Sequence, residues 1–185
     1  MKKILIGALV GAIIVFAWSA VSWMALGIHT NSFKYSENQD KIMEVITQNI
    51  TEDGHYVMPY ANPNTTSREE MEKVQADMIG KPYATVTFHK EVKDNMGMNM
   101  GVGFVYNFIA VMMMALVLWY GRSGMPSMAQ RCMAAFAFVI FMVFQNHLLD
   151  GMWMEVPMHV MMPEIIDTVA GLGLTSVWLA FYVKE

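Results

Sequence analysis

The sequence predicts an all-α membrane protein, a bundle of four transmembrane helices with a small α/β extracytoplasmic cap between the first and second spans. Hydrophobic residues make up 55% of the 185-residue chain and charged residues only 15%, a more apolar composition than soluble domains of this size have. The charges are also unevenly placed, because residues 34–94 hold many of them while long stretches elsewhere hold none. This distribution is typical of apolar spans joined by a polar domain.

Four apolar runs have the length of membrane spans, since a helix needs about 20 apolar residues to cross the hydrocarbon core. The first run follows Lys2 and Lys3 and is too long for the apolar region of a cleaved signal peptide. The third and fourth are short, so three spans is the alternative. The predicted organisation is a first span at 1–28, a cap at 29–95 and a three-helix remainder at 96–185, with spans at about 98–120, 131–150 and 164–183.

The start of the fourth span is predicted from Pro163, Glu164 and Asp167. Proline fits the first turn of a helix, and acidic side chains are favourable near its positive end. Asp167 is therefore interpreted as a first-turn charge and not as a functional group.

The short loops predict the orientation. Only basic charges, Arg122 and Arg131, lie between the second and third spans, and only acidic charges, Asp150 and Glu155, lie between the third and fourth. Basic loops face the cytoplasm, and the lysines near both ends of the chain then fall on the same side. The prediction is a bacterial inner-membrane protein with both termini inside and the cap in the periplasm.

The cap is predicted to be folded. Ser36 with Gln39 and Ser67 with Glu70 have the spacing of capping boxes, which predicts two helix starts. Two further stretches alternate and contain strand-forming residues, which predicts a pair of short strands: 54–59 and 83–90. About 65 residues are marginal for independent stability, so the cap is expected to pack on the bundle or on a partner.

Composition excludes two classes of function. The formal charge is −4 and no cluster of Lys and Arg is interleaved with aromatic residues, so no nucleic-acid partner is expected. Cys132 is the single cysteine, which excludes an intramolecular disulfide and dithiol redox chemistry.

Methionine is unusually frequent, at 21 residues, and two clusters fall at the predicted outer face. Thioethers are soft ligands that suit Cu(I), which gives the hypothesis of a metal-handling protein. The alternative is that methionine serves as flexible apolar filler, and no cofactor is then expected. The candidate copper ligands are Met96, Met98, Met100, Met154, Met158 and His159.

A possible polar site is predicted at His147 and Asp150, which are three residues apart and share a helix face if the helix continues. Such a pair could ligate a metal or relay protons. An axial haem site formed by His29 and His147 is a further alternative. The alternative to a functional site is that His147 and Asp150 are hydrated side chains at the membrane interface.

The Lys-Lys start, the first span with Trp18 and Trp23, the Gly54-x-Tyr56-x-x-Pro59 segment and the three later spans resemble a loosely defined group of uncharacterised small bacterial four-span inner-membrane proteins. The resemblance covers the whole chain and implies the same topology and location. It adds no functional residues.

The sequence thus gives a first hypothesis of a non-catalytic accessory or assembly subunit that associates with the lipid bilayer and with other membrane subunits. The alternatives are a Cu(I)-binding protein and an enzyme with a haem or metal centre near His147 and Asp150.

Overall fold

The computed structural model describes residues 2–62, 64 and 67–184. The chain forms two compact units. We call residues 1–34 with 95–185 the bundle and residues 35–94 the inserted unit.

The bundle is built from long apolar helices. Within the described residues, four helical segments are long and apolar enough to cross a membrane, with mean hydropathy between 1.5 and 2.5. This confirms the four predicted apolar helices. The elements are α1 (Lys2–Met24), α4 (Met96–Gly121), the short turn η1 (Arg122–Gly124), α5 (Met128–Met142), the π-helical stretch η2 (Val143–Leu149), α6 (Asp150–Trp153) and α7 (Met158–Tyr182).

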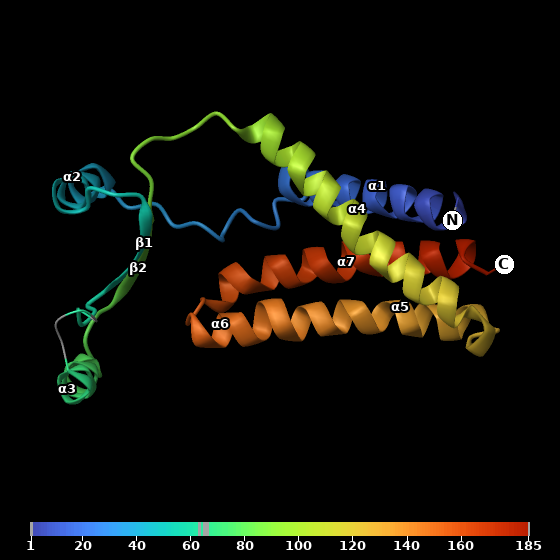
Figure 1. Cartoon of the computed structure of the whole chain (residues 1–185). Coiled ribbons are helices and arrows are strands. Elements are labelled where there is room, and N and C mark those ends of the chain that lie inside the picture. The colour runs from blue at the N-terminus through green and yellow to red at the C-terminus, as the bar shows by residue number, and fades with distance from the viewer. Residues whose placement is uncertain (1, 63, 65–66, 185) are drawn as a thin grey trace. The chain divides into compact units, whose positions relative to one another are not determined.

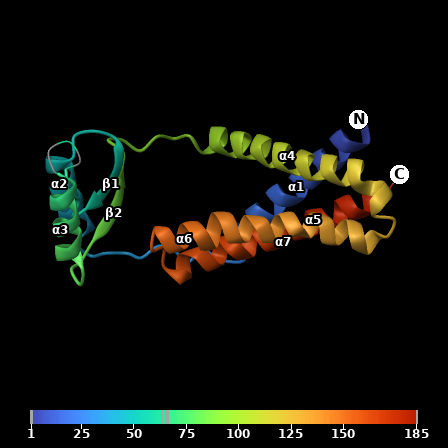
Figure 2. The same cartoon turned by 60° about the horizontal axis from the view of Figure 1, so that its bottom comes forward.

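Small residues bring α1 close to its neighbours. Helix α1 packs against both α4 and α7, and α5 packs along α7 (Figure 1; Figure 2). A Cβ placed on Gly11 would lie 2.6 Å from Val111 Cγ1 and 2.9 Å from Thr175 Cγ2. The Thr175 hydroxyl donates to the Gly11 carbonyl at 3.2 Å, so glycine permits both the close packing and a hydrogen bond between helices.

Both chain ends lie at the same end of the bundle (Figure 1). At this end Arg131, near the start of α5, is only 6% exposed. Its Nε donates to the Ala180 carbonyl in the last turn of α7 at 2.9 Å, and its Nη1 donates to the carbonyls of Met125 and Pro126. Arg131 was expected as a loop charge, and it in fact bonds a helix-end carbonyl that has no partner within its own helix.

Helix α7 starts earlier than the sequence indicated. It begins at Met158, after Pro157 as N-cap, so that Pro163 lies inside the helix. Asp167 is consequently about two and a half turns from the helix start. The interpretation of Asp167 as a first-turn charge is wrong, because residues 158–162, which are apolar except for His159, extend the helix toward its N-terminus.

The inserted unit has the predicted order of helices and strands. Strands β1 (Gly54–Met58) and β2 (Ala84–Phe88) pair antiparallel, which confirms the predicted pairing. Helix α2 spans Gln39–Asn49 and helix α3 spans Arg68–Met78.

The two predicted capping boxes have different outcomes. The box of Ser67 and Glu70 is present at the start of α3 and is confirmed. The box of Ser36 and Gln39 is wrong, because Asn38 is the N-cap of α2. The Ser36 hydroxyl instead accepts the backbone N–H of Asn38 at 3.3 Å.

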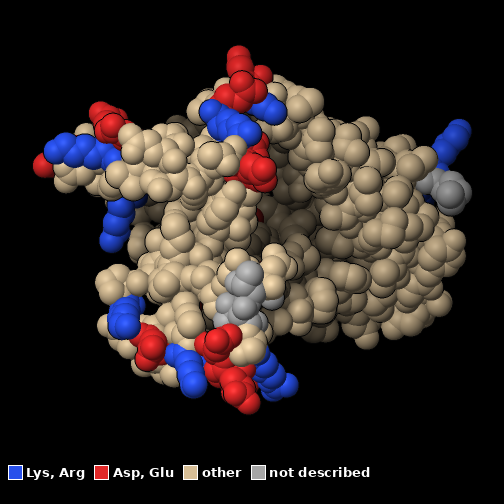
Figure 3. Space-filling model, turned by 60° about the vertical axis from the view of Figure 1, so that its left-hand side comes forward, with Lys and Arg blue, Asp and Glu red and all other residues tan. Residues whose placement is uncertain are grey.

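The two units differ in surface chemistry. On the face shown in Figure 3, most Lys, Arg, Asp and Glu side chains gather on the inserted unit, while the visible surface of the bundle is almost uncharged. This face of the bundle therefore has the apolar character that a lipid-facing surface requires.

Candidate functional site

A buried cluster of polar side chains joins three parts of the bundle. His29 Nε2, on the stretch that follows α1, lies 2.9 Å from Asp167 Oδ2 of α7. The indole Nε1–H of Trp18, on α1, donates to the other carboxylate oxygen, Asp167 Oδ1, at 3.0 Å. The two oxygens of the Asp167 carboxylate thus have different partners, Trp18 and His29.

A tight turn places His29 in this cluster. Gly27 has a φ of +60°, a conformation that glycine adopts without steric cost. The N–H of Thr30 donates to the Gly27 carbonyl at 3.1 Å, and the N–H of Ser32 donates to the His29 carbonyl at 3.0 Å. These turns bring His29 back against the bundle directly after α1 ends.

The His29 imidazole is enclosed. Its side chain is 5% exposed and Asp167 is 14% exposed. The Trp23 ring stacks on the imidazole with centroids 3.9 Å apart and an interplanar angle of 10°. His29 Nδ1 has no hydrogen-bond partner among the described residues, and it lies 3.8 Å from Glu164 Oε1.

These contacts define the hydrogen-bonding state of His29. An ionised carboxylate only accepts hydrogen bonds, so the proton of a neutral His29 lies on Nε2, where it is donated to Asp167. Nδ1 then carries a lone pair that points toward a second acceptor. The arrangement resembles the outer-sphere orientation of histidine by carboxylate that metal and proton-transfer sites use.

The predicted pair of His147 and Asp150 lies next to this cluster. His147, in the π-helical stretch η2, has its Nε2 2.7 Å from Thr168 Oγ1 on α7. Asp150 and His147 line the same hollow of about 140 Å³. Other residues that line this hollow are Asn146, Met154, Met161 and Glu164.

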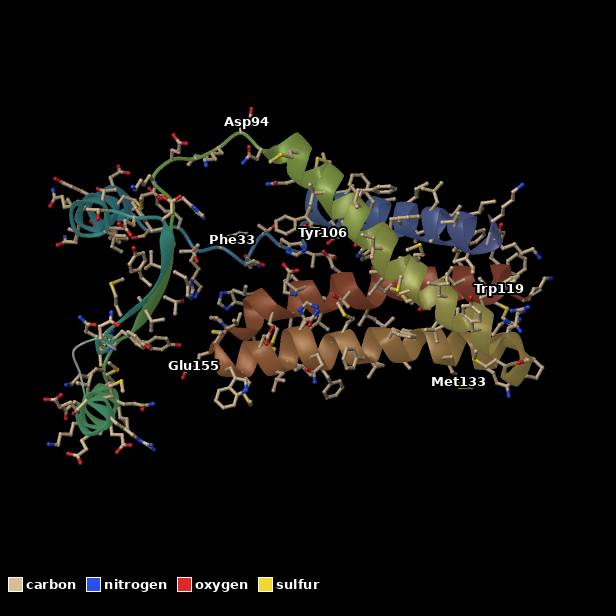
Figure 4. All side chains as sticks on the ribbon, viewed as in Figure 1. Phe33, Asp94, Tyr106, Trp119, Met133 and Glu155 are labelled. Atoms are coloured by element: carbon tan, nitrogen blue, oxygen red, sulfur yellow. The ribbon has the colours of Figure 1, made fainter. Side chains whose placement is uncertain are left out.

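Glycine also shapes this hollow. A Cβ on Gly151 would lie 2.5 Å from Met161 Sδ, so the absence of a side chain lets α6 approach α7. Glu164 lines the hollow and also faces His29. It is therefore the residue that connects the hollow with the buried cluster. Figure 4 shows Glu155, in the turn between α6 and α7, at the end of the bundle opposite Trp119 and Met133.

The candidate copper ligands are mostly open to the surroundings. Met96, Met98 and Met100 follow one another in the first turns of α4 and are 73%, 63% and 46% exposed. Alternating residues of a helix point to different sides, so Met98 does not share a face with the other two. Met158 and His159 are exposed near the start of α7, and of the six candidates Met154 lines the hollow.

Side chains other than methionine do not form a metal site in the described part of the chain. Residues 2–62, 64 and 67–184 contain no group of three or more His, Cys, Asp or Glu side chains arranged to hold a metal ion. This says nothing about thioether ligands, and the Cu(I) hypothesis stays a prediction.

Sequence reasoning missed the pairing of His29 with Asp167. The two residues are 138 positions apart, and hydropathy indicates how deep a residue lies but not which way its helix is rotated. A signal was present, since Asp167 is an acid close to a long uncharged run and Gly27 precedes His29 at the end of the first span. Ionisable groups in such places are default candidates for function.

Comparison with models of known protein families gives no match, and searches against curated proteins and solved structures give none either.

Proposed function

We propose that the chain is a non-catalytic accessory or assembly subunit of a larger complex in the bacterial inner membrane. In this proposal the four apolar helices span the bilayer, both termini are cytoplasmic, and the inserted unit is periplasmic and binds a partner subunit.

The placement of charge supports this orientation. Arg122 and Arg131 lie near the end of the bundle that holds both termini, and Lys184 follows the last helix. Asp150 and Glu155 belong to the α6 region at the opposite end. Basic residues are favoured on the cytoplasmic side, so the two ends differ in the way that this topology requires.

The observation that carries the partner proposal is the small core of the inserted unit. Among its described hydrophobic side chains, Ile50 and Phe88 are the buried ones. Helices α2 and α3, all of whose residues are described, bury no side chain. A unit of this size needs an apolar core to offset the loss of chain entropy, and the inserted unit obtains little of it from its own residues.

The unburied apolar side chains of the inserted unit form a surface suited to a protein partner. Met71, Val74 and Met78 of α3 line a hollow of about 320 Å³ together with Val57 and Tyr60. Aromatic side chains and methionine are enriched in protein interfaces. A partner subunit that fills this hollow would supply the missing core.

Site-specific photocrosslinking in the native membrane tests the partner. A photoreactive residue at Val74, which lines the hollow, is expected to capture a second protein chain. The same residue at the neighbouring Lys73, which is exposed and does not line the hollow, is the matched control and is expected not to. Capture of the chain's own bundle from position 74, or equal yields at both positions, would contradict the proposal.

Gentle purification provides the second readout. Mass spectrometry and elemental analysis of one sample report copurifying chains and bound metal together. Partner chains without metal support the accessory role. Stoichiometric copper without partners would instead favour the alternative metal-handling function of the methionine clusters.

A further inference from the structure

We propose that His29 and Glu164 form a proton-binding site, and that uptake of one proton latches the stretch after α1 onto α7. The proposal concerns the bundle alone and does not depend on the partner proposed for the inserted unit.

The geometry of two facing acceptors points to a proton. With the Nε2 proton donated to Asp167, His29 Nδ1 is an acceptor, and 3.8 Å away it meets Glu164 Oε1, which is also an acceptor when ionised. Two acceptors cannot bond to each other. A proton on Nδ1 turns this mismatch into a charge-assisted hydrogen bond, which is about twice as strong as a neutral one.

Burial limits what can reach Nδ1. The atom is enclosed, with no hydrogen-bond partner among the described residues, while the Trp23 ring covers the face of the imidazole. Glu164 is 49% exposed and lines the hollow. A proton can therefore pass from water in the hollow to the Glu164 carboxylate and then to Nδ1, whereas a larger ligand would first have to displace Glu164.

The proton balance is simple. Water outside the bundle supplies one proton, Glu164 carries it and is ionised again after transfer, and the His29 imidazole becomes an imidazolium. The charged ring then donates from Nε2 to Asp167 and from Nδ1 to Glu164. For the second bond the gap of 3.8 Å has to close by a small side-chain rotation, because N–H···O bonds extend to about 3.2 Å.

Two acidic side chains face the ring. They are Glu164 and Asp167, both on α7. From α1 the ring meets Trp23, which is uncharged. The hollow beyond Glu164 adds His147 and Asp150, and no Lys or Arg is among the residues that line it. Of these, His147 already has a partner in Thr168.

The expected consequence is a tighter attachment when the ring carries the second proton. The Nδ1 hydrogen bond to Glu164 can form only in that state, because the neutral ring has no donor at Nδ1. The residues affected are those from Gly27 to Lys34, which lead from α1 toward the inserted unit.

Nitrogen NMR of the full-length protein in lipid bilayers, with labelled histidine, tests the site directly. The His29 signal is assigned by its loss in His29→Gln. Between about pH 8 and pH 5, the range over which histidine switches, the signal is expected to change from one protonated ring nitrogen to two. Spectra are recorded with a chelator present. A His29 ring that stays neutral at pH 5, or a change that requires added metal, would overturn the proposal.

The Glu164→Gln variant tests whether Glu164 affects the protonation of His29. Glutamine removes one of the two negative charges beside the ring, and its amide can donate to the Nδ1 lone pair. The protonated fraction of His29 at pH 5 is therefore expected to be lower in this variant than in the wild type. Asp150→Asn changes an acid that lines the same hollow, and this control is expected to behave like the wild type. Equal protonation of His29 in the wild type and in Glu164→Gln would overturn the role of Glu164.

A spin label provides the readout of the latch. Asn31→Cys is placed in a Cys132→Ser background, so that the exposed position 31 carries the one label. Label mobility is expected to fall between pH 8 and pH 5, and this fall is expected to vanish with Glu164→Gln. The same mobility at both pH values, or the same fall in both proteins, would contradict the latch.

Discussion

At the scale of single residues, the bundle depends on groups that let helices meet closely and satisfy each other's polar atoms. Gly11 accommodates Val111 and Thr175, and the Trp178 indole donates to the Gly7 carbonyl at 3.1 Å. Lipid offers no hydrophobic driving force for helix association, so between helices that span a bilayer such packing and hydrogen bonds carry much of the association energy.

Substitution of two glycines tests this dependence. Gly11→Ala would place a methyl group within 2.6 Å of Val111, and overpacking of this kind costs about 1–3 kcal/mol. Gly101→Ala, which meets no atom within 4 Å, is the control and gains up to about 1 kcal/mol of helix propensity. Unfolding in detergent micelles measures both. A Gly11→Ala protein as stable as Gly101→Ala would show that α1 can move away without cost.

At the scale of elements, side-chain hydrogen bonds hold the irregular ends of helices and strands. Arg131 bonds the last turn of α7, Ser67 and Glu70 cap α3, and Asp53 ties the end of β2. The Asp53 carboxylate accepts the backbone N–H of Lys90 at 3.0 Å. This bond closes the two-stranded sheet beyond its last paired residues.

The closure of the sheet by Asp53 depends on pH. The hydrogen bond from the Lys90 N–H, with a further contribution from His89, lowers the pKa of Asp53 below its ordinary value of 3.8. A group whose pKa is lowered by folding contributes stability above the ordinary value, and this is lost as the pH falls through the lowered one. The sheet is therefore expected to keep this closure at neutral pH and lose it in strong acid.

Hydrogen exchange of the full-length protein checks the Asp53 bond. At neutral pH, Asp53→Asn is expected to speed exchange of the Lys90 amide, because a neutral amide oxygen is a weaker acceptor than a carboxylate. The control Asp77→Asn, on exposed α3, removes a charge from the same unit without touching this bond. Unchanged exchange in Asp53→Asn would show that the contact does not protect the backbone.

At the scale of the whole molecule, the asymmetry of the bundle's ends predicts how it sits in a membrane. Arg122, Arg131 and Lys184 belong to the end with both termini, and the buried cluster with its hollow belongs to the end from which residues 35–94 emerge. Positive-inside insertion would then expose the hollow to the periplasm, where external pH changes reach it.

Cysteine labelling in intact cells measures this topology. In a Cys132→Ser background, Lys93→Cys is expected to react with a membrane-impermeant maleimide, whereas Ser123→Cys, in the turn between α4 and α5, is expected to react only after permeabilisation. Both positions are exposed, so accessibility to solvent is matched. The reverse pattern would invert the orientation, and labelling of both positions in intact cells would argue against four spans.

The elements whose signals are local could be predicted from the amino-acid sequence. Hydropathy over about 20 residues is enough to find the four long helices, and the pairs Ser67 with Glu70 and β1 with β2 follow from patterns within short stretches. The starts of α2 and α7 were misplaced, because an N-cap depends on backbone conformation as well as on spacing, as Asn38 and Pro157 show.

The polar groups that contact one another across the bundle became known from the packing of its helices. His29, Trp18 and Asp167 come together because α1 and α7 pack closely and because the chain turns back at Gly27. The rotation of each helix about its own axis sets such contacts, and in a helix that is apolar on all sides no periodic pattern reveals that rotation. The contact between His29 and Asp167 could therefore not be predicted from the sequence, although each residue could be recognised there as an ionisable group near the end of an apolar run.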